Sequence, residues 1–301
     1  MTLRDGRGSV IFIRMSTIPV RRLADKDRPL RFSEEFNIRA IERVLGGKDL
    51  VQSLHRHDHY FLMAVRSGKG VHECDLTPHV IAPNTIYFMR PGQVHRLELR
   101  SGTTGYIMQF KADLYAPVDS SARRMLRQAG TIGCFRPDVR RHRELMTLLG
   151  RIHQEHELRQ QGFVDIVRAY LGVLFAELVL RSSRTTRPVR AMNAYAEERL
   201  QELLELIETH VRAKKQVLDY AGMMHLSPYQ INAIAKAGSG RTCSELITDQ
   251  IILEAKRHLL ATSDQVSQVA DHLGYADVSY FIRFFKRHTG HTPESFRQRS
   301  R

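Results

Sequence analysis

Residues 269–290 read VADHLGYADVSYFIRFFKRHTG, and the same kind of pattern occurs earlier as LDYAGMMHLSPYQINAIAK over residues 218–236. Each stretch predicts a helix with an apolar stripe, a short turn, and a second short helix with a polar outer face. This order is typical of the helix-turn-helix motif. The chain is therefore predicted to contain two such motifs, although an ordinary helical hairpin with no ligand would show the same apolar spacing.

The residue types at the two turns explain this spacing. Ala270 is small enough to let the two helices of the later copy approach closely, and Gly274 accepts a positive φ at little cost. Asp277 is expected to cap the helix that follows. In the earlier copy, Ser227 is the expected cap and Pro228 takes the first helical position.

The second helix of such a motif places its outer face in the major groove of DNA. In the later copy, Phe281, Phe284 and Phe285 recur at the spacing of a core face. The other positions predict base contacts from Val278, Ser279, Tyr280 and Arg283, and phosphate contacts from Lys286 and Arg287.

In the earlier copy, Ile231 and Ile234 are expected to face inward. The DNA-contacting residues predicted there are Tyr229, Gln230, Asn232 and Lys236. A predicted helix over residues 243–262 joins the two copies.

Residues 190–301 resemble the DNA-binding domain of AraC/XylS-type transcription regulators. The resemblance rests on residues 252–260 (ILEAKRHLL), 269–270, 273–275, 279–281, 283–286, Gly290 and 292–297 (TPESFR). It implies two helix-turn-helix units bridged by one long helix, which read adjacent major-groove segments on one face of DNA.

The earlier copy departs from the family pattern at several positions. His225 stands where the family usually has the turn glycine, Ala233 where a basic residue is common, and Ala235 where a core phenylalanine is common. Residues 237–239 replace a charged stretch. We therefore expect this first unit to pack more loosely and to make fewer phosphate contacts.

Composition predicts a globular protein of two domains that does not enter a membrane. The chain has 301 residues, of which 42% are hydrophobic and 26% charged. No apolar run approaches the roughly 18 residues that a membrane span needs. Three scattered cysteines without a CxxC pattern indicate neither a disulfide framework nor a cysteine zinc site, which fits a reducing cytoplasm.

The net charge of +14 does not itself locate a DNA-binding surface. Residues 189–301 carry 15 Lys+Arg against 13 Asp+Glu, so most of the positive charge lies in the rest of the chain. A domain with a small net charge can still present one basic face. The motif, rather than the overall charge, is the evidence for DNA.

The predicted fold class is α+β with several domains. Residues 1–34 predict an arm without fixed structure, and residues 35–118 predict a barrel of short strands separated by glycine and proline turns. Residues 119–181 have helical spacing and are interpreted as a dimerisation segment, residues 182–190 as a linker, and residues 191–301 as the all-α DNA-binding domain.

The N-terminal half resembles the two cupin motifs found in sensory domains of the same regulator family. The resemblance rests on His55-Arg56-His57, the turn Gly68–Gly70 and the run Pro91–His95. It implies a double-stranded β-helix barrel with a ligand cavity. The residues predicted to bind the effector are His55, His57, Phe61, Arg90, His95 and Met108.

Three histidines in one barrel raise the question of a metal. His55, His57 and His95 are suitable ligands for zinc or iron. A metal-binding cupin would also supply a glutamate, and residues 60–63 (YFLM) stand near its usual position. We therefore predict no metal and no other cofactor, with the three histidines as ligands only if a metal is found.

The leading hypothesis is a ligand-responsive transcription activator. Its predicted partners are promoter DNA, a small-molecule effector, RNA polymerase and a second copy of the chain, and its predicted location is the cytoplasm. Two alternatives remain open: a metal-dependent cupin enzyme fused to a DNA-binding module, and a DNA-binding protein that responds to no ligand. No nucleophile elbow, P-loop or HExxH motif is present, so the chain is predicted not to be an enzyme.

Overall fold

The computed structural model describes residues 2–4, 10–12, 17–23, 35–116, 120–182 and 194–299. They fall into two compact units, one within residues 19–190 and one built mainly from residues 191–301. Most of the predicted N-terminal arm and of the predicted linker lies outside the described residues. Within the arm, β1 (Thr2–Arg4) pairs with β2 (Val10–Phe12) in an antiparallel hairpin.

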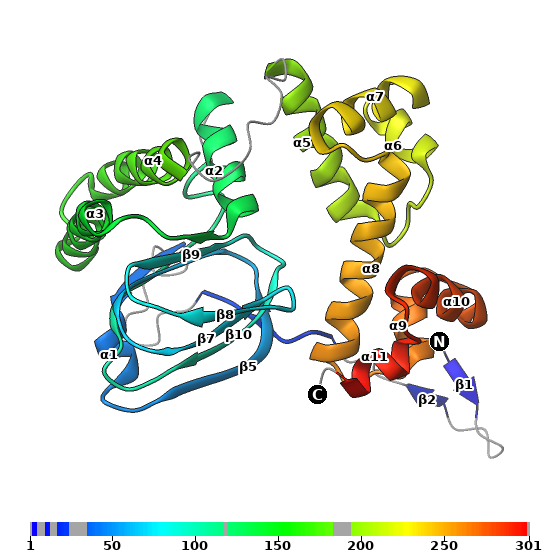
Figure 1. Cartoon of the computed structure of the whole chain (residues 1–301), viewed down its shortest axis with the longest axis horizontal. Coiled ribbons are helices and arrows are strands. Elements are labelled where there is room, and N and C mark those ends of the chain that lie inside the picture. The colour runs from blue at the N-terminus through cyan, green and yellow to red at the C-terminus, as the bar shows by residue number, and fades with distance from the viewer. Residues whose placement is uncertain are drawn as a thin grey trace. The chain divides into compact units, whose positions relative to one another are not determined.

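Two five-stranded sheets form the cupin-like part of the first unit (Figure 1). The first sheet has the order β3 (Val20–Arg21), β5 (Leu50–His57), β10 (Val94–Leu99), β7 (Gly70–Cys74) and β8 (Thr77–Ile81). The second has the order β12 (Cys134–Phe135), β9 (Thr85–Met89), β6 (Tyr60–Ser67), β11 (Thr104–Phe110) and β4 (Phe36–Ala40). All pairings are antiparallel except β3 with β5.

Side-chain alternation divides the apolar residues of this unit into two layers. Phe61, Met63 and Val65 of β6 join a core between the sheets, to which α1 (Ile41–Leu45) also contributes. The intervening Leu62 and Ala64 face the other way and pack under helices. Because both faces of β6 are covered, residues 61–65 are apolar without interruption, which is typical of a strand buried on both sides.

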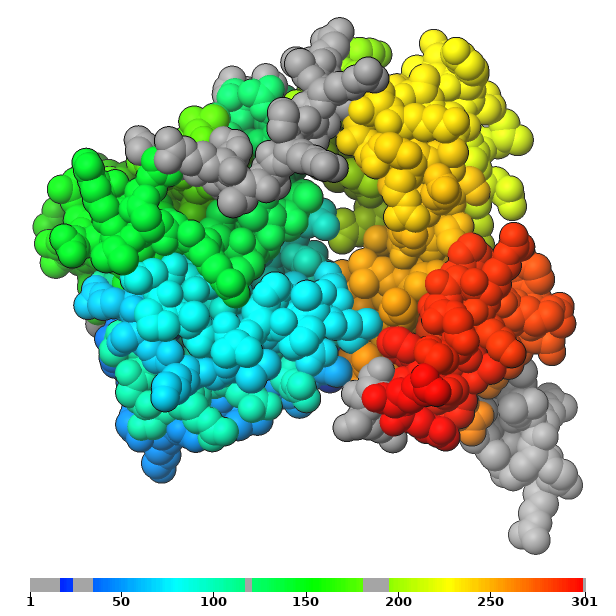
Figure 2. Space-filling model, in the orientation of Figure 1, coloured from blue at the N-terminus to red at the C-terminus, as the bar shows by residue number. Residues whose placement is uncertain are grey.

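Three helices cover the outer face of the second sheet, as Figures 1 and 2 show for α2–α4 over the barrel. They are α2 (Ser120–Ile132), α3 (Val139–Leu158) and α4 (Phe163–Ser182). Asp138 caps α3 by accepting a hydrogen bond from the backbone N–H of Arg141. The predicted cupin-like barrel with a helical middle segment is therefore confirmed.

Within residues 194–299, the second unit has seven helices, and they confirm the predicted all-α domain with two helix-turn-helix motifs. The first motif is α6 (Val217–Met223) with α7 (Pro228–Ser239), and the second is α9 (Val266–His272) with α10 (Val278–Thr289). The long helix α8 (Cys243–Ala261) runs between them (Figure 1). The remaining two helices are α5 (Ala194–His210) and α11 (Pro293–Arg299).

The local signals at the two turns act as the sequence predicts. Ser227 accepts a hydrogen bond from the N–H of Gln230 at the start of α7, and Asp277 accepts from the N–H groups of Ser279 and Tyr280 at the start of α10. Gly274 has a φ of +73°. His225, at the corresponding turn of the first motif, has a φ of +53°, so the chain keeps the left-handed conformation there without glycine.

Each motif has its own hydrophobic core. Phe281 and Phe285 are fully buried in the second core, while Phe284 is half-buried and packs against both cores. In the first core, Ile231 and Ala235 are the buried residues of α7. The expectation for Ile234 needs correction, because Ile234 lies half-exposed at the edge of the face on which Ile231 and Ala235 are buried.

Among the described residues, no helix combines the length and apolar character needed to cross a membrane.

Candidate functional site

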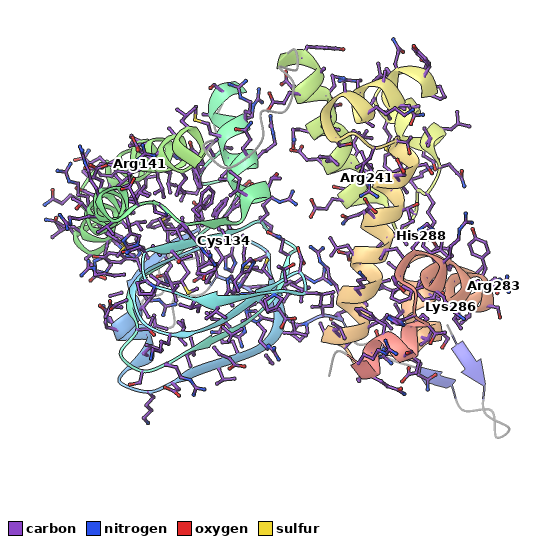
Figure 3. The ribbon with its side chains drawn as sticks, viewed as in Figure 1. Cys134, Arg141, Arg241, Arg283, Lys286 and His288 are labelled. Carbon is purple, nitrogen blue, oxygen red and sulfur yellow. The ribbon has the colours of Figure 1, made fainter. Side chains whose placement is uncertain are left out.

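The exposed face of α10 brings together most of the DNA-contacting residues predicted for the second motif. Ser279, Tyr280, Arg283, Lys286 and Arg287 are all exposed, and the opposite face of the helix is anchored by the buried phenylalanines. Arg283 and Lys286 extend from the outside of α10 (Figure 3). Residues 279, 283 and 286 follow the spacing of one helix face, so a single approach to DNA can engage all three.

Val278 is placed differently from its neighbours. It is half-buried and packs against the core of the second motif. As the first residue of α10 it closes the end of that core, because the apolar side chain lies on the same side as Phe281. The structure therefore gives Val278 a packing role in place of the predicted exposed position.

The first motif presents fewer groups to a ligand than the sequence predicts. The Oε1 atom of Gln230 accepts a hydrogen bond from the N–H of Ser227, at 2.9 Å, and so completes the capping of α7. Asn232 donates from Nδ2 to the carbonyl of Pro228 at 2.9 Å and accepts at Oδ1 from the N–H of Cys243 at 3.0 Å. These bonds engage the amide oxygens of both side chains, while the Gln230 side chain itself remains exposed.

Contacts at the start of α7 and at the start of α8 explain why Gln230 and Asn232 differ from expectation. Gln230 stands three residues after Ser227, and this capping-box spacing was readable in the sequence. The bond from Asn232 to the start of α8 joins residues that are 11 positions apart and lie on different helices, so no local sequence pattern predicts it. Tyr229, which is 84% exposed, and Lys236 remain on the open surface of α7.

The loop before α6 holds the turn of the second motif in place. Lys215 donates from Nζ to the carbonyl of Arg212 at 2.7 Å and lies 3.4 Å from the carbonyl of Gly274. The same ammonium group lies over the ring of Tyr275, 5.1 Å from its centroid. Arg212 also reaches the buried carboxylate of Glu254 on α8. This network links the turn of the second motif to the loop before α6 and to α8.

A cluster of buried histidines lies inside the barrel of the first unit. His55 and His57 come from β5 and His95 from β10, and all three are at most 5% exposed. The Nε2 atom of His95 lies 2.8 Å from Nε2 of His57 and 3.0 Å from Nε2 of His55. The three residues predicted from the sequence as a group are thus brought together.

A fourth histidine joins this cluster. His72 of β7 is buried, and its Nε2 atom lies 3.0 Å from Nδ1 of His95. No short motif contains His72, so it was not among the predicted residues. The structure buries His72, the central residue of β7, on the inner face of the barrel, and strand alternation is the only sequence signal for that position.

The buried site favours neutral imidazoles. Desolvation by burial lowers the pKa of His55 to about 4 and that of His57 to about 3, with nearby positive charge adding to the effect. Burial likewise lowers the pKa of His72 to about 3 and that of His95 well below its ordinary value. All four rings are therefore uncharged at neutral pH, which leaves ring nitrogens with free lone pairs.

Neighbouring side chains define the edges of the cluster. Phe61 stacks on His57 with ring centroids 5.5 Å apart. His59 is engaged elsewhere, with Nδ1 at 2.8 Å from Oδ1 of Asp58 and Nε2 at 3.1 Å from the amide nitrogen of Gln109. Phe61 therefore remains with the histidines as predicted, and His59 stands beside them.

Two of the predicted effector-binding residues lie apart from the histidines. Met108 packs in the layer between the second sheet and the helices. Arg90 lies along α2, where a β-carbon on Gly130 would come within 2.5 Å of its Cγ and Cδ atoms. Both follow from strand alternation: Met89 and Ile107 face the inside of the barrel, so the residues that follow them, Arg90 and Met108, point outward.

Comparison with known proteins gives matches to both units. Residues 220–299 match a family described as a helix-turn-helix domain, and residues 47–169 match one described as an AraC-like ligand binding domain. The chain is 21% identical over 249 residues to the HTH-type transcriptional activator RhaR of Mannheimia succiniciproducens, a match that covers 82% of this chain and 87% of that protein.

Two further relatives differ in how much they share. The MmsAB operon regulatory protein of Pseudomonas aeruginosa is 27% identical over 262 residues, covering 84% of this chain and 80% of that protein. The bifunctional transcriptional activator/DNA repair enzyme AdaA of Bacillus subtilis is 33% identical over 99 residues, covering 33% of this chain. The matched part spans only 47% of AdaA.

Proposed function

Because this chain belongs to the AraC family of transcription regulators, with an AraC-like ligand-binding domain and a helix-turn-helix DNA-binding domain, we propose that it is a promoter-binding activator controlled by a small-molecule effector. The effector binds in the barrel, and promoter DNA binds the two helix-turn-helix motifs. Effector binding shifts the protein toward the form that recruits RNA polymerase in the cytoplasm, since a ligand favours the conformation that it binds more tightly.

The exposed face of α10 is the observation that carries this proposal. Ser279, Tyr280 and Arg283 lie in its first half, the part of a recognition helix that meets base edges. Lys286 and Arg287 follow in its last turn, where they can neutralise phosphates. α10 carries no acidic residue that would repel DNA.

The first motif makes the smaller contribution to DNA recognition. Its open surface offers Tyr229 and Lys236, while the amide oxygens of Gln230 and Asn232 accept hydrogen bonds from backbone N–H groups of the protein. The exposed Ala233 offers only a methyl group, which can contact a thymine methyl but donates no hydrogen bond. We assign most of the sequence discrimination to α10.

Helix α4 supports the proposal of a homodimer. Its inner face is buried under α3 and the second sheet, yet its outer face is apolar too: Ile166, Val173 and Leu180 are 41%, 52% and 62% exposed. These residues are seven apart, and Ala169 and Ala176 fall between them at the positions that complete a heptad seam. An apolar seam of this kind is stabilised by a second copy of the same helix, which removes it from water.

Activation and the absence of catalysis are inferences from the relatives. RhaR is named as a transcriptional activator and the MmsAB operon protein as a regulatory protein. AdaA is named as an activator that is also a DNA repair enzyme, but its match covers a third of this chain. We propose that this chain acts by binding alone.

Selection of DNA sites from a random pool by the full-length protein tests the proposal. We expect a site that contains two short conserved blocks about one helical turn apart, with the block read by α10 more strongly conserved. Repeating the selection with an Arg283→Ala variant should remove conservation from that block alone. Recovery of no common sequence from either protein would contradict the proposed function.

A further inference from the structure

We propose that His55, His57 and His95 hold a divalent transition-metal ion in the barrel, and that the effector is an anion that completes the coordination of this ion. The second half of this inference rests on the proposed function, because it identifies the chemical class of the effector. The first half concerns the barrel alone.

The geometry of the three rings is that of a set of metal ligands. Each of His55, His57 and His95 offers one ring nitrogen, and these three nitrogens all lie within 4.8 Å of one another. Two nitrogens that bind a tetrahedral zinc ion at 2.0–2.1 Å are about 3.3 Å apart. The Nε2 separations of 2.8 and 3.0 Å around His95 are close to that value. A small rotation of the rings therefore admits an ion.

The hydrogen-bond partners of the other ring nitrogens point to the same conclusion. Nδ1 of His55 lies 2.7 Å from the carbonyl oxygen of Ser53, which can only accept, so this nitrogen carries the proton. Nδ1 of His57 faces the carbonyl oxygen of Arg21 at 3.4 Å in the same way. In neutral rings both Nε2 atoms then present lone pairs.

These lone pairs converge on a single nitrogen. Nε2 of His95 carries at most one proton and can satisfy either His55 or His57, but not both. A cation among the three Nε2 atoms satisfies all of them at once. Backbone carbonyls that fix the outer nitrogen of each ring are also the usual partners of metal-bound histidines.

His72 is placed to position His95. Its Nε2 atom lies 3.0 Å from Nδ1 of His95, so it can accept the proton of that nitrogen and direct the lone pair of Nε2 toward the ion. The stacked ring of Phe61 stands against His57 and closes an apolar side of the site. His72 is thus a positioning residue rather than a ligand.

The charge of the site defines the effector. Three neutral imidazoles leave the two positive charges of the ion uncompensated in a buried place, and the ligand group contains no carboxylate or thiolate. An anionic oxygen donor, such as a carboxylate or phenolate, offsets this charge by taking the open coordination position.

Cobalt(II) is the probe for the metal site, because imidazole ligands suit it and its visible spectrum reports coordination. The full-length protein is first freed of metal with a chelator and then titrated with Co²⁺. We expect visible absorption that saturates at one ion per chain. Zn²⁺ added to the metal-free protein in a separate experiment should raise its melting temperature above that of the metal-free protein. Absence of saturable binding by the folded wild-type protein would overturn the proposal.

Variants separate the ligands from the neighbouring histidines. His57→Gln and His95→Gln should abolish the cobalt spectrum, and His72→Gln should weaken binding about 10–100-fold. His79→Gln is the matched control, since His79 pairs with His72 across β7 and β8 but lies outside the ligand group. Binding that is unchanged in the first two variants would overturn the assignment.

Azide added to the cobalt-loaded protein tests the open position. A change in the visible spectrum that saturates with azide supports an anionic effector, and an unchanged spectrum contradicts it. Site selection on DNA is measured in parallel. If DNA sites are recovered but no metal binds, this inference fails and the proposed function stands; if metal binds but no DNA site is recovered, the proposed function fails together with the effector assignment.

Discussion

Gly274 lies directly against the backbone of Arg212. A β-carbon on Gly274 would be 2.2 Å from the carbonyl oxygen of Arg212, and the glycine also has a φ of +73°. The turn of the second helix-turn-helix motif is therefore packed against the loop that precedes the first. Glycine is required at this turn for two separate reasons, its left-handed conformation and its lack of a side chain.

Replacement of Gly274 by alanine should destabilise the DNA-binding domain by roughly 2–5 kcal/mol, from left-handed strain together with the overlap at Arg212. Gly240→Ala is a matched control, because Gly240 has the same φ of +73° and nothing within 4 Å of its expected β-carbon. That control should cost about 1 kcal/mol. Urea unfolding of both variants checks the difference, and equal losses would show that contact with Arg212 adds nothing.

Replacement of His225 by glycine should stabilise the first motif. His225 holds a φ of +53° at an exposed turn, a conformation that disfavours residues with a β-carbon. We expect a gain of about 0.5–1 kcal/mol in the free energy of unfolding. His225→Ala should give no gain, because it removes the imidazole and keeps the strained backbone. A gain from alanine equal to that from glycine would assign the effect to the side chain.

Asn232→Ala should lower the stability of the folded protein and have little effect on its affinity for DNA. The variant loses the bond to the N–H of Cys243 at the start of α8 and the bond to Pro228, at a cost of about 1–2 kcal/mol. Tyr229→Ala, at an open position of the same helix, should leave stability unchanged and weaken DNA binding. Thermal melts and DNA titrations of the two variants should give opposite patterns, and the same pattern in both would contradict this division of roles.

The fold was predictable because its signals are local. Ser227, Asp277 and Gly274 specify the ends of helices through residues within a few positions of them. The inner face of the barrel was partly predictable for the same reason, since His55 and His57 alternate on one strand.

The parts that the sequence did not predict depend on distant contacts. The bond between Asn232 and Cys243 forms only when α7 meets α8, and His72 meets His95 only when β7 pairs with β10. Met108 was assigned to the wrong layer because a strand buried on both faces gives no alternation of polar and apolar residues to tell its faces apart. The tertiary structure determines which partners such residues contact and which layer they occupy.

Arg283→Ala should weaken binding to the selected DNA site by about 1–3 kcal/mol while binding to random DNA changes little. Arg283 is exposed in the first half of α10, the half that we propose to enter the major groove, where its guanidinium could reach a base edge. Lys286→Ala should weaken binding to both DNAs alike and reduce the salt slope by about one. Titrations at several salt concentrations compare the two variants. An equal loss on both DNAs for Arg283→Ala would make it a phosphate contact.

The histidine cluster should make the metal-free barrel sensitive to mild acid. Burial lowers the pKa of His72 to about 3 and that of His95 well below 6.5, whereas the unfolded chain binds protons near pH 6.5. Below pH 6.5 the unfolded state therefore binds more protons than the folded state, and stability falls as the pH falls. His72 and His95 should each contribute about 1.4 kcal/mol of loss per pH unit in this range.

Chemical unfolding in the presence of a chelator, at about pH 7.5 and about pH 5.5, measures this loss. His95→Gln should lose less stability between the two conditions than the wild-type protein, because one buried basic group is gone. A barrel whose unfolding free energy is the same at both pH values would contradict the neutral state of the cluster, because four imidazoles that are protonated equally in both states produce no dependence on pH.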